Sequence, residues 1–176
     1  MQNIFPILIK EILSQYSLHP AGTHGISHWA RVALYGRHIC SHTGVDPKIT
    51  DYFALFHDSR RRNESIDPGH GKRGAALATE LNKKYNFLSE SEMQLLTEAC
   101  KWHTHGRTDA DLAIQACWDA DRLDLPRVGT EPRPKFLCTE IAIKTETITW
   151  ARAMAMQRVW PEEILDLWRI KPDQFR

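Results

Sequence analysis

The sequence of 176 residues contains no apolar run close to the roughly 18 residues that a membrane-spanning helix needs. Its first residues lack a basic leader followed by a small-residue cleavage site, so we expect no signal peptide. Lysine and arginine (23) nearly balance aspartate and glutamate (22), and the net charge is +1. No global field therefore attracts nucleic acid or an anionic membrane, and any basic site must be local.

Cysteine is scarce and is not arranged in pairs. The four cysteines are widely scattered and form no C-x-x-C motif, which argues against disulfides or a zinc site. They are Cys40, Cys100, Cys117 and Cys138, and each lies in an apolar helical pattern. Buried free thiols of a reducing compartment are the simplest interpretation, and we expect a cytoplasmic protein.

Period-two alternation, internal repeats and low-complexity segments are also absent. Apolar residues recur instead at intervals of three and four, the period of an α-helix. This pattern predicts an all-α bundle of about seven or eight helices, forming a single domain over residues 1–176. Its motif-bearing core lies at about 24–125 and its C-terminal helices at 136–170. The predicted helices span 3–17, 26–42, 46–56, 71–86, 90–103, 108–123, 136–157 and a short segment after Pro161.

Capping residues and prolines support several of these helix boundaries. Asp46 followed by Pro47 is typical of an N-cap and a first helical residue. Ser89 with Glu92 matches a capping box. Residues 128–135 are rich in proline and predict a loop before the next helix.

Histidines and aspartates gather at the ends of the predicted helices. When helices pack antiparallel, such ends can meet at one pocket, and imidazole with carboxylate is a ligand set for iron, manganese, zinc or cobalt. His28 lies near the start of the second helix, and His57-Asp58 ends the third. The later helices carry the remaining candidates, namely His70, His103, His105, Asp119, Asp121 and Asp124.

Four of these residues form a recognisable pattern. His28, the doublet His57-Asp58, and Asp121 within "ADRLD" resemble the H…HD…D signature of the HD-domain superfamily of metal-dependent phosphohydrolases. The resemblance covers roughly residues 24–125. "HGKRGA", beginning at His70, also resembles a stretch of superfamily members that hold two metals.

The resemblance implies a function and a ligand set. It implies hydrolysis of a phosphate mono- or diester, such as a nucleotide or related metabolite, through a metal-bound hydroxide. His28, His57, Asp58 and Asp121 would hold the first ion, and Asp58, as the catalytic bridge, would share a second ion with His70 and His103. One carboxylate can join two cations about 3.5–4 Å apart. One or two divalent ions of Mn, Fe, Co, Ni or Zn are expected, and His105 competes with His103 as a ligand.

A basic stretch, "SRRR", directly follows the doublet. Guanidinium groups grip phosphate oxygens through paired hydrogen bonds. We therefore expect phosphate contacts from Arg60, Arg61, Arg62, Lys72 and Arg73, with Arg107 as a further candidate. The alternatives are a solvated charge run and, for His57-Asp58, a helix cap paired with a nearby arginine.

Three more residues are expected to support the ligands from behind. Asp119 lies about 200° from Asp121 around a helix, so it would orient a ligand histidine rather than bind the ion itself. His24 and His105 complete this outer set. The same His/Asp set also resembles the mixed-valent di-iron oxygenases of the superfamily, and a non-catalytic nucleotide-binding module is a third alternative. The sequence leaves a homo-oligomer open.

Overall fold

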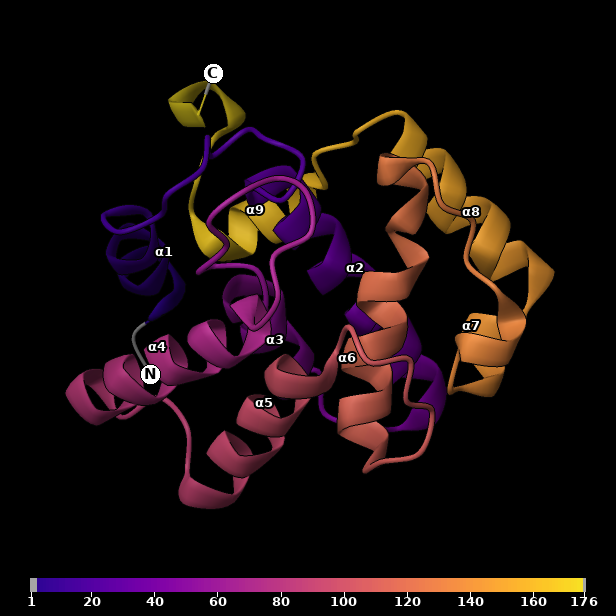
Figure 1. Ribbon diagram of the computed structural model, residues 1–176, viewed down its shortest axis with the longest axis horizontal. Helices are drawn as coiled ribbons and strands as arrows, with labels where there is room; N and C mark the ends of the chain where they lie inside the picture. Colours follow the sequence, from indigo (N-terminus) through magenta and orange to yellow (C-terminus); the bar gives the residue numbers. More distant parts are fainter. Residues whose placement is uncertain (1–2, 176) are drawn as a thin grey trace.

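The computed structural model describes residues 3–175, and helices are the regular elements of this part of the chain (Figure 1). The all-α prediction is confirmed, although the described residues form nine α-helices rather than seven or eight. Three 3-10 helices lie at Leu125–Val128, Pro134–Phe136 and Pro172–Phe175. The α-helices are α1 (Phe5–Leu13), α2 (Ile26–Thr43), α3 (Lys48–Phe56), α4 (His70–Tyr85), α5 (Glu90–Trp102), α6 (Leu112–Leu123), α7 (Glu140–Ile143), α8 (Thr145–Met156) and α9 (Glu162–Trp168).

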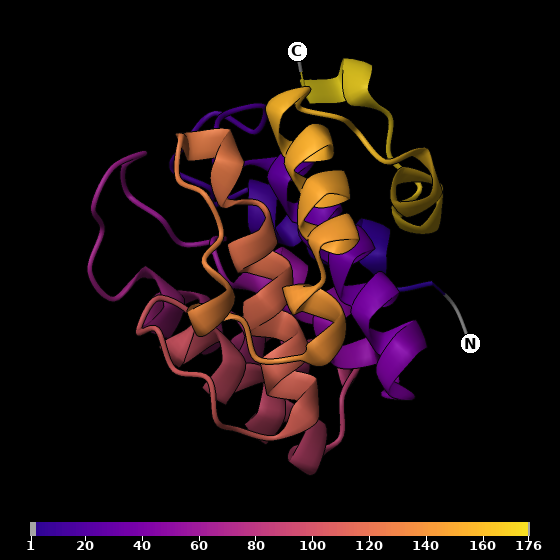
Figure 2. The ribbon, with the colours of Figure 1, turned by 90° about the vertical axis from the view of Figure 1, so that its right-hand side faces the viewer.

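Helix α3 lies at the centre of the bundle. It packs against α2, α5 and α6, while α4 packs along α5 (Figure 1). Every residue from 49 to 56 is buried, which explains why this short segment is apolar on all sides. Asp51, the charged exception, pairs with Arg37. Helices α7 and α8 cover α2 and α6 from the other side (Figure 2).

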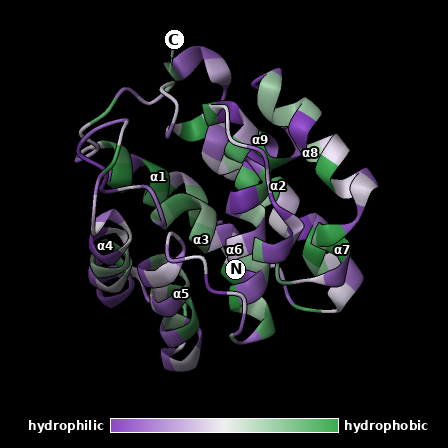
Figure 3. Cartoon of the chain, turned by 45° about the vertical axis from the view of Figure 1, so that its right-hand side comes forward, coloured by the Kyte–Doolittle hydropathy of each residue, from purple (hydrophilic) through white to green (hydrophobic). Residues whose placement is uncertain are grey.

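Hydropathy follows this arrangement. Apolar colours lie on α3 and on the inward faces of the helices around it, and polar colours lie outside (Figure 3). Of the four cysteines, three are buried and Cys138 is half-buried, and all four are free thiols. None of the helices within residues 3–175 is both long enough and apolar enough to cross a membrane.

The single long helix predicted at 136–157 is wrong, because this segment is broken twice. Thr139 caps α7 by accepting from the backbone N–H of Ala142, and Lys144 between α7 and α8 has the extended ψ of 136°. The buried Asp119 carboxylate also accepts from the N–H groups of Cys138 and Thr139 at 2.7 and 2.8 Å. Long-range hydrogen bonds thus override the local helical pattern here.

Of three further boundaries, one agrees with the sequence prediction and two differ from it. The capping box of Ser89 and Glu92 is present at the start of α5. Asp46 accepts from the N–H of Lys48 at 2.8 Å, but α3 begins at Lys48, so Pro47 and not Asp46 occupies the N-cap position. The first helix is shorter than predicted, 5–13 rather than 3–17, because the chain turns after Ser14.

Two glycines let α4 approach its neighbours closely. A Cβ at Gly74 would lie 2.1 Å from the carbonyl oxygen of Phe56, and one at Gly71 would lie 2.1 Å from that of Cys100. Only a residue without a side chain fits against these carbonyls. The backbone of α4 therefore lies directly on the ends of α3 and α5. This contact places His70, the first residue of α4, next to both ends.

We predict that Gly74→Ala destabilises the protein although alanine is the better helix former. Alanine gains up to about 1 kcal/mol of helix propensity, but the added methyl group must displace the Phe56 carbonyl, so we expect a net loss of about 2 kcal/mol. Urea denaturation measures the change. Ala76→Gly, on the exposed face of α4, is the matched control and should lose only about 1 kcal/mol. Unchanged or increased stability of Gly74→Ala would contradict the close approach.

Candidate metal centre

The structure brings four histidines and two aspartates together from five helices. His28 lies in the first turn of α2, His57 directly follows α3, His70 begins α4 and His103 directly follows α5. All four residues are buried, with at most 5% of their surface exposed. Two groups of potential metal ligands form, and Asp58 belongs to both. The side chains named from the sequence thus lie together, and Asp121 of α6 joins the first group. That they bind metal stays a prediction.

The first group surrounds Oδ2 of Asp58. The Nε2 atoms of His28 and His57 lie 3.6 and 3.7 Å from this oxygen. Oδ1 of Asp121 lies 3.5 and 3.7 Å from the same two nitrogens. Four donor atoms, from α2, from α6 and from the residues directly after α3, thus face a common point.

The second group surrounds the other oxygen of Asp58. Nε2 of His70 lies 3.1 Å from Oδ1 of Asp58, and Nε2 of His103 lies 3.9 Å from it. The two oxygens of one carboxylate are thus directed at two separate groups of imidazoles, which is the arrangement required of a bridging ligand.

Every ring is held through its Nδ1 atom. His57 donates to the carbonyl oxygen of Phe53 at 3.0 Å, His70 to that of Asp67 at 2.7 Å, and His103 to that of Cys100 at 2.7 Å. Because a carbonyl oxygen only accepts, Nδ1 must carry the proton, and the neutral ring then has its lone pair on Nε2. His28 Nδ1 likewise donates to Asp124, at 2.7 Å.

The Nε2 atoms face each other in two pairs. The Nε2 atoms of His28 and His57 lie 3.0 Å apart, and those of His70 and His103 lie 2.9 Å apart. Burial lowers the pKa of His57 to about 3, and it also lowers the pKa of His103, so these two rings are neutral. Burial alone would lower the pKa of His70, but the hydrogen bond and the charge of Asp58 raise it. Two opposed lone pairs repel unless a cation or a shared proton lies between them.

The donor set fits a divalent transition metal. A cation bound at about 2.1 Å has neighbouring ligands about 3.0–3.4 Å apart, and most of the distances within each group approach these values. Neutral imidazole and carboxylate are the ligands that Mn, Fe, Co, Ni and Zn share. In His57, His70 and His103, a backbone carbonyl accepts from the Nδ1–H and so fixes the orientation of the ring. This support is the same whether one ion binds or two.

Asp124 supports His28 from behind. It is fully buried and accepts from His28 Nδ1, from Arg31 at 2.7 and 2.9 Å, and it lies 3.2 Å from the Tyr35 hydroxyl. Burial alone would raise the pKa of Asp124, but the hydrogen bonds from His28 and Arg31 lower it below its usual value. Its place three residues after Asp121, one helical turn further on, was the signal in the sequence that could have identified it.

The expectation that Asp119 orients a ligand histidine is wrong. Both of its carboxylate oxygens are occupied by the backbone and hydroxyl of the segment before α7, at Cys138 and Thr139. Asp119 points to the opposite side of α6 from Asp121, as the helical angle predicts. Its role is to shape the chain, and Asp124 has the role that was expected of it.

The two histidines predicted to support the ligands, His24 and His105, differ in position. His24 is buried at the edge of the centre, with its Nδ1 against the Glu64 carboxylate and its ring centroid 6.2 Å from that of His28. His105 is exposed and contacts the Trp102 ring and the Thr104 hydroxyl. His103 rather than His105 therefore reaches Asp58, and the supporting role expected of His105 is not seen.

Of the arginine trio, Arg61 reaches the centre. It is 7% exposed, and its Nη1 lies 3.5 Å from Oδ1 of Asp58 and 3.3 Å from Nε2 of His70. Arg62 is exposed, and its backbone N–H binds Asp67. Only Arg61 of the three thus stands beside the proposed ligands through its side chain.

Two other basic residues are used within the protein, contrary to the expectation of phosphate contacts. Arg60 donates to the backbone and side-chain oxygens of Gln15 at 2.8 and 3.0 Å. Arg73 binds both oxygens of Asp67 at 2.6 Å and the carbonyl of Arg60 at 3.0 Å. These guanidinium groups brace the loop between α3 and α4 and are not free to bind a phosphate in this structure.

Lys72 and Arg107 gather around one aromatic ring. The Lys72 amino group lies 5.9 Å from the centroid of the Trp102 ring, and the Arg107 guanidinium lies 4.0 Å from it. Both side chains are exposed. Within residues 3–175, neither contacts the six candidate ligands, so their binding of phosphate stays a prediction.

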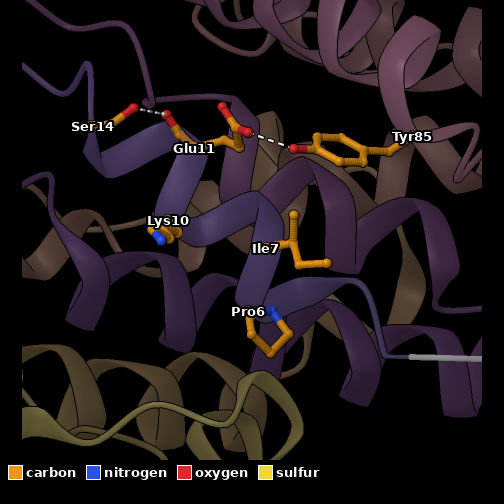
Figure 4. Close-up of a pocket in the computed structure, with 6 residues that line it drawn as sticks. All are labelled: Pro6, Ile7, Lys10, Glu11, Ser14 and Tyr85. Atoms are coloured by element: carbon orange, nitrogen blue, oxygen red, sulfur yellow. Dashed lines mark hydrogen bonds between the residues drawn. The ribbon is translucent and has the colours of Figure 1, made fainter.

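A surface groove elsewhere on the molecule lacks this chemistry. It measures about 550 Å³ and is lined by Pro6, Ile7, Lys10, Glu11, Ser14 and Tyr85 (Figure 4). Its carboxylate, Glu11, is already paired with Lys84 and with the Tyr85 hydroxyl. We therefore place the functional site at the buried His/Asp groups.

Comparison with known proteins bears on the fold and the coarse class of protein. No protein-family model and no curated protein matches the chain. Among solved structures, it is similar to a predicted HD superfamily hydrolase from an uncultured Thermotogales bacterium. The two are 27% identical over 93% of this chain and 91% of that chain, with a TM-score of 0.62. The fold and the metal-binding groups together thus agree with a metal-dependent hydrolase of the HD type, and they specify no substrate.

We predict that Asp124→Asn weakens metal binding at the first group. The amide cannot accept as strongly from both His28 and Arg31, so the His28 ring loses its fixed orientation, and affinity should fall about 10–100-fold. Calorimetric titration of the metal-free protein with Mn²⁺ measures this, with circular dichroism to verify folding. Asp119→Asn, five residues earlier in α6, is the matched control and should lower stability while leaving Mn²⁺ affinity within about threefold. Equal affinities in wild type and Asp124→Asn would contradict the supporting role.

Proposed function

We propose that the protein is a metal-dependent phosphohydrolase that cleaves a phosphate mono- or diester. One observation carries the proposal: two pairs of buried imidazole Nε2 atoms, facing each other at 3.0 and 2.9 Å, lie on either side of one carboxylate. This arrangement is costly to bury without cations. The similarity to a predicted HD superfamily hydrolase supports the reaction class.

The six candidate ligands would bind two cations. His28, His57 and Asp121 would hold one cation, His70 and His103 a second, and Asp58 both. When bound, such cations generate a nucleophile from water near neutral pH and neutralise charge on a phosphate. The side chain of Asp121 is 15% exposed, against 3% for Asp58 and none for His28, so a substrate would approach past Asp121.

Arg61 and His24 are the protein groups best placed to meet a phosphate ester. The permanently charged Arg61 offers donors to phosphate oxygens beside Asp58. His24 is held at Nδ1 by Glu64, and no described residue binds its Nε2, which leaves that atom for a substrate. A nucleotide or related metabolite is the substrate class we propose, on the basis of the resemblance to the superfamily.

Removal of metal should abolish activity. We expect hydrolysis of a generic aryl phosphate to stop after treatment with a chelator, because the cations would supply both the nucleophile and the charge that neutralises the phosphate. Addition of Mn²⁺, Co²⁺ or Ni²⁺ should restore turnover, measured by release of the phenol. Asp58→Asn should show no recovery with any of these ions, since both groups lose their shared ligand.

The same assay separates the alternatives. Hydrolysis needs no O₂, so the rate under argon should equal the rate in air, whereas a di-iron oxygenase would stop. Full activity in a preparation shown by elemental analysis to be free of metal would contradict the proposed function. Tight nucleotide binding without turnover at any metal concentration would indicate a binding module instead.

The arginines should differ individually. With saturating metal, Arg61→Gln should lower kcat/KM for the phosphate ester about tenfold, because a charge-assisted contact contributes roughly 1.5–3 kcal/mol. Arg60→Gln is the matched control and should change kcat/KM less than about twofold, since its side chain binds Gln15. Steady-state kinetics on the two variants make the comparison. Equal effects would show that the loop, and not the Arg61 charge, is responsible.

A further inference from the structure

The second group of ligands already contains a positive charge. Nη1 of Arg61 lies 3.3 Å from Nε2 of His70 and 3.5 Å from Oδ1 of Asp58. It donates toward the same lone pairs that the second cation would use. His70 and Asp58 thus each have two competing partners, a guanidinium and a metal ion.

The loop between α3 and α4 holds this guanidinium in place. Nε of Arg61 donates to the carbonyl of Asn63 at 3.3 Å, and Nη2 donates to that of Ser65. The loop is itself braced by Asp67, which accepts from the backbone of Arg62 and from Arg73. Arg61 is 7% exposed, so the charge cannot swing into solvent without rearranging the loop.

The first group contains no such charge. Within residues 3–175, no lysine or arginine nitrogen contacts Nε2 of His28 or of His57. The nearby Arg127 lies behind the ligands, with its Nε donating to the carbonyl of Thr23 and lying 3.6 Å from Asp124. The two groups share Asp58 but differ in their electrostatic surroundings.

The distances limit how far a second cation could lie from Arg61. Nε2 of His70 and Oδ1 of Asp58 are 3.1 Å apart, so a cation about 2.1 Å from both lies within about 4.4 Å of Nη1. Like charges at that separation in a buried site disfavour each other. The first cation meets no comparable opposition.

We propose that Arg61 weakens the second metal position, so that the centre fills in two separate steps. The inference rests on the proposed function, in that both groups bind metal. The first ion binds at His28, His57, Asp58 and Asp121, and the second binds only at a higher concentration of free metal. Arg61 is thereby the residue that separates the two affinities, and in the singly loaded state its guanidinium stands beside the empty second group.

Metal titration of four proteins tests this proposal. The metal-free wild type, Arg61→Gln, Arg60→Gln and His70→Ala are titrated with Mn²⁺ by calorimetry, and bound metal is counted by elemental analysis after equilibrium dialysis. Wild type should show one strong site and a second at least tenfold weaker. Arg61→Gln should strengthen the second site at least tenfold and leave the first within threefold. Arg60→Gln should match wild type, and His70→Ala should lose only the second ion.

Four results would overturn the proposal. They are two equally strong ions in wild type, an unchanged or weaker second site in Arg61→Gln, the same shift in Arg60→Gln, and no second ion in any protein at saturating Mn²⁺. Arg61→Met, which keeps the apolar stem, repeats the test if the glutamine variant does not fold. If no ion binds to any of the proteins, the proposed function fails as well, and wild type alone reveals that. One strong ion in wild type with no response to Arg61→Gln leaves the proposed function standing and rejects only the role of Arg61.

Discussion

The Asp58 carboxylate, placed between two pairs of opposed imidazoles, is the constraint on which the rest of the structure depends. A buried carboxylate and four buried rings are unfavourable unless each polar atom has a partner. The Nδ1 atoms of the rings are tied to three carbonyl oxygens and to Asp124, so each Nε2 atom has one fixed direction. The arrangement allows little adjustment, and therefore the helices that carry the rings must meet accurately.

The fold meets this requirement with short, rigid helix ends. The buried helix α3 fixes the doublet His57-Asp58, and two glycines bring the start of α4 against it. The support extends beyond the motif-bearing core. Arg31, which binds Asp124, also donates to the carbonyl of Val159, and the Tyr35 hydroxyl lies 3.1 Å from the carbonyl of Ala151 in α8. The C-terminal helices thus help to hold a ligand that lies more than a hundred residues away in sequence.

The arginines around the centre also depend on their hydrogen-bond partners. The chain is nearly neutral, yet guanidinium groups border the centre on both sides, with Arg61 beside the ligands and Arg31 behind them. Their neighbours decide what each can do. Arg31 is neutralised by Asp124, whereas Arg61 is held by loop carbonyls and keeps a charge that a phosphate or a competing cation would meet. Identical side chains therefore have different roles.

The sequence by itself determined the helical class and the capping box at Ser89, because periodicity and cap residues are local properties, and its resemblance to the HD-domain superfamily supplied the six candidate ligands. Only the tertiary structure decided which aspartate supports His28, which arginine reaches Asp58, and where the segment after residue 136 breaks. Asp119 and Asp124 occur in one short motif, but they have different partners. Asp119 binds Thr139 in the segment before α7, and Asp124 binds His28 in α2. A pattern shows which face of a helix a residue occupies, whereas its partner depends on distant chain that packs against that face.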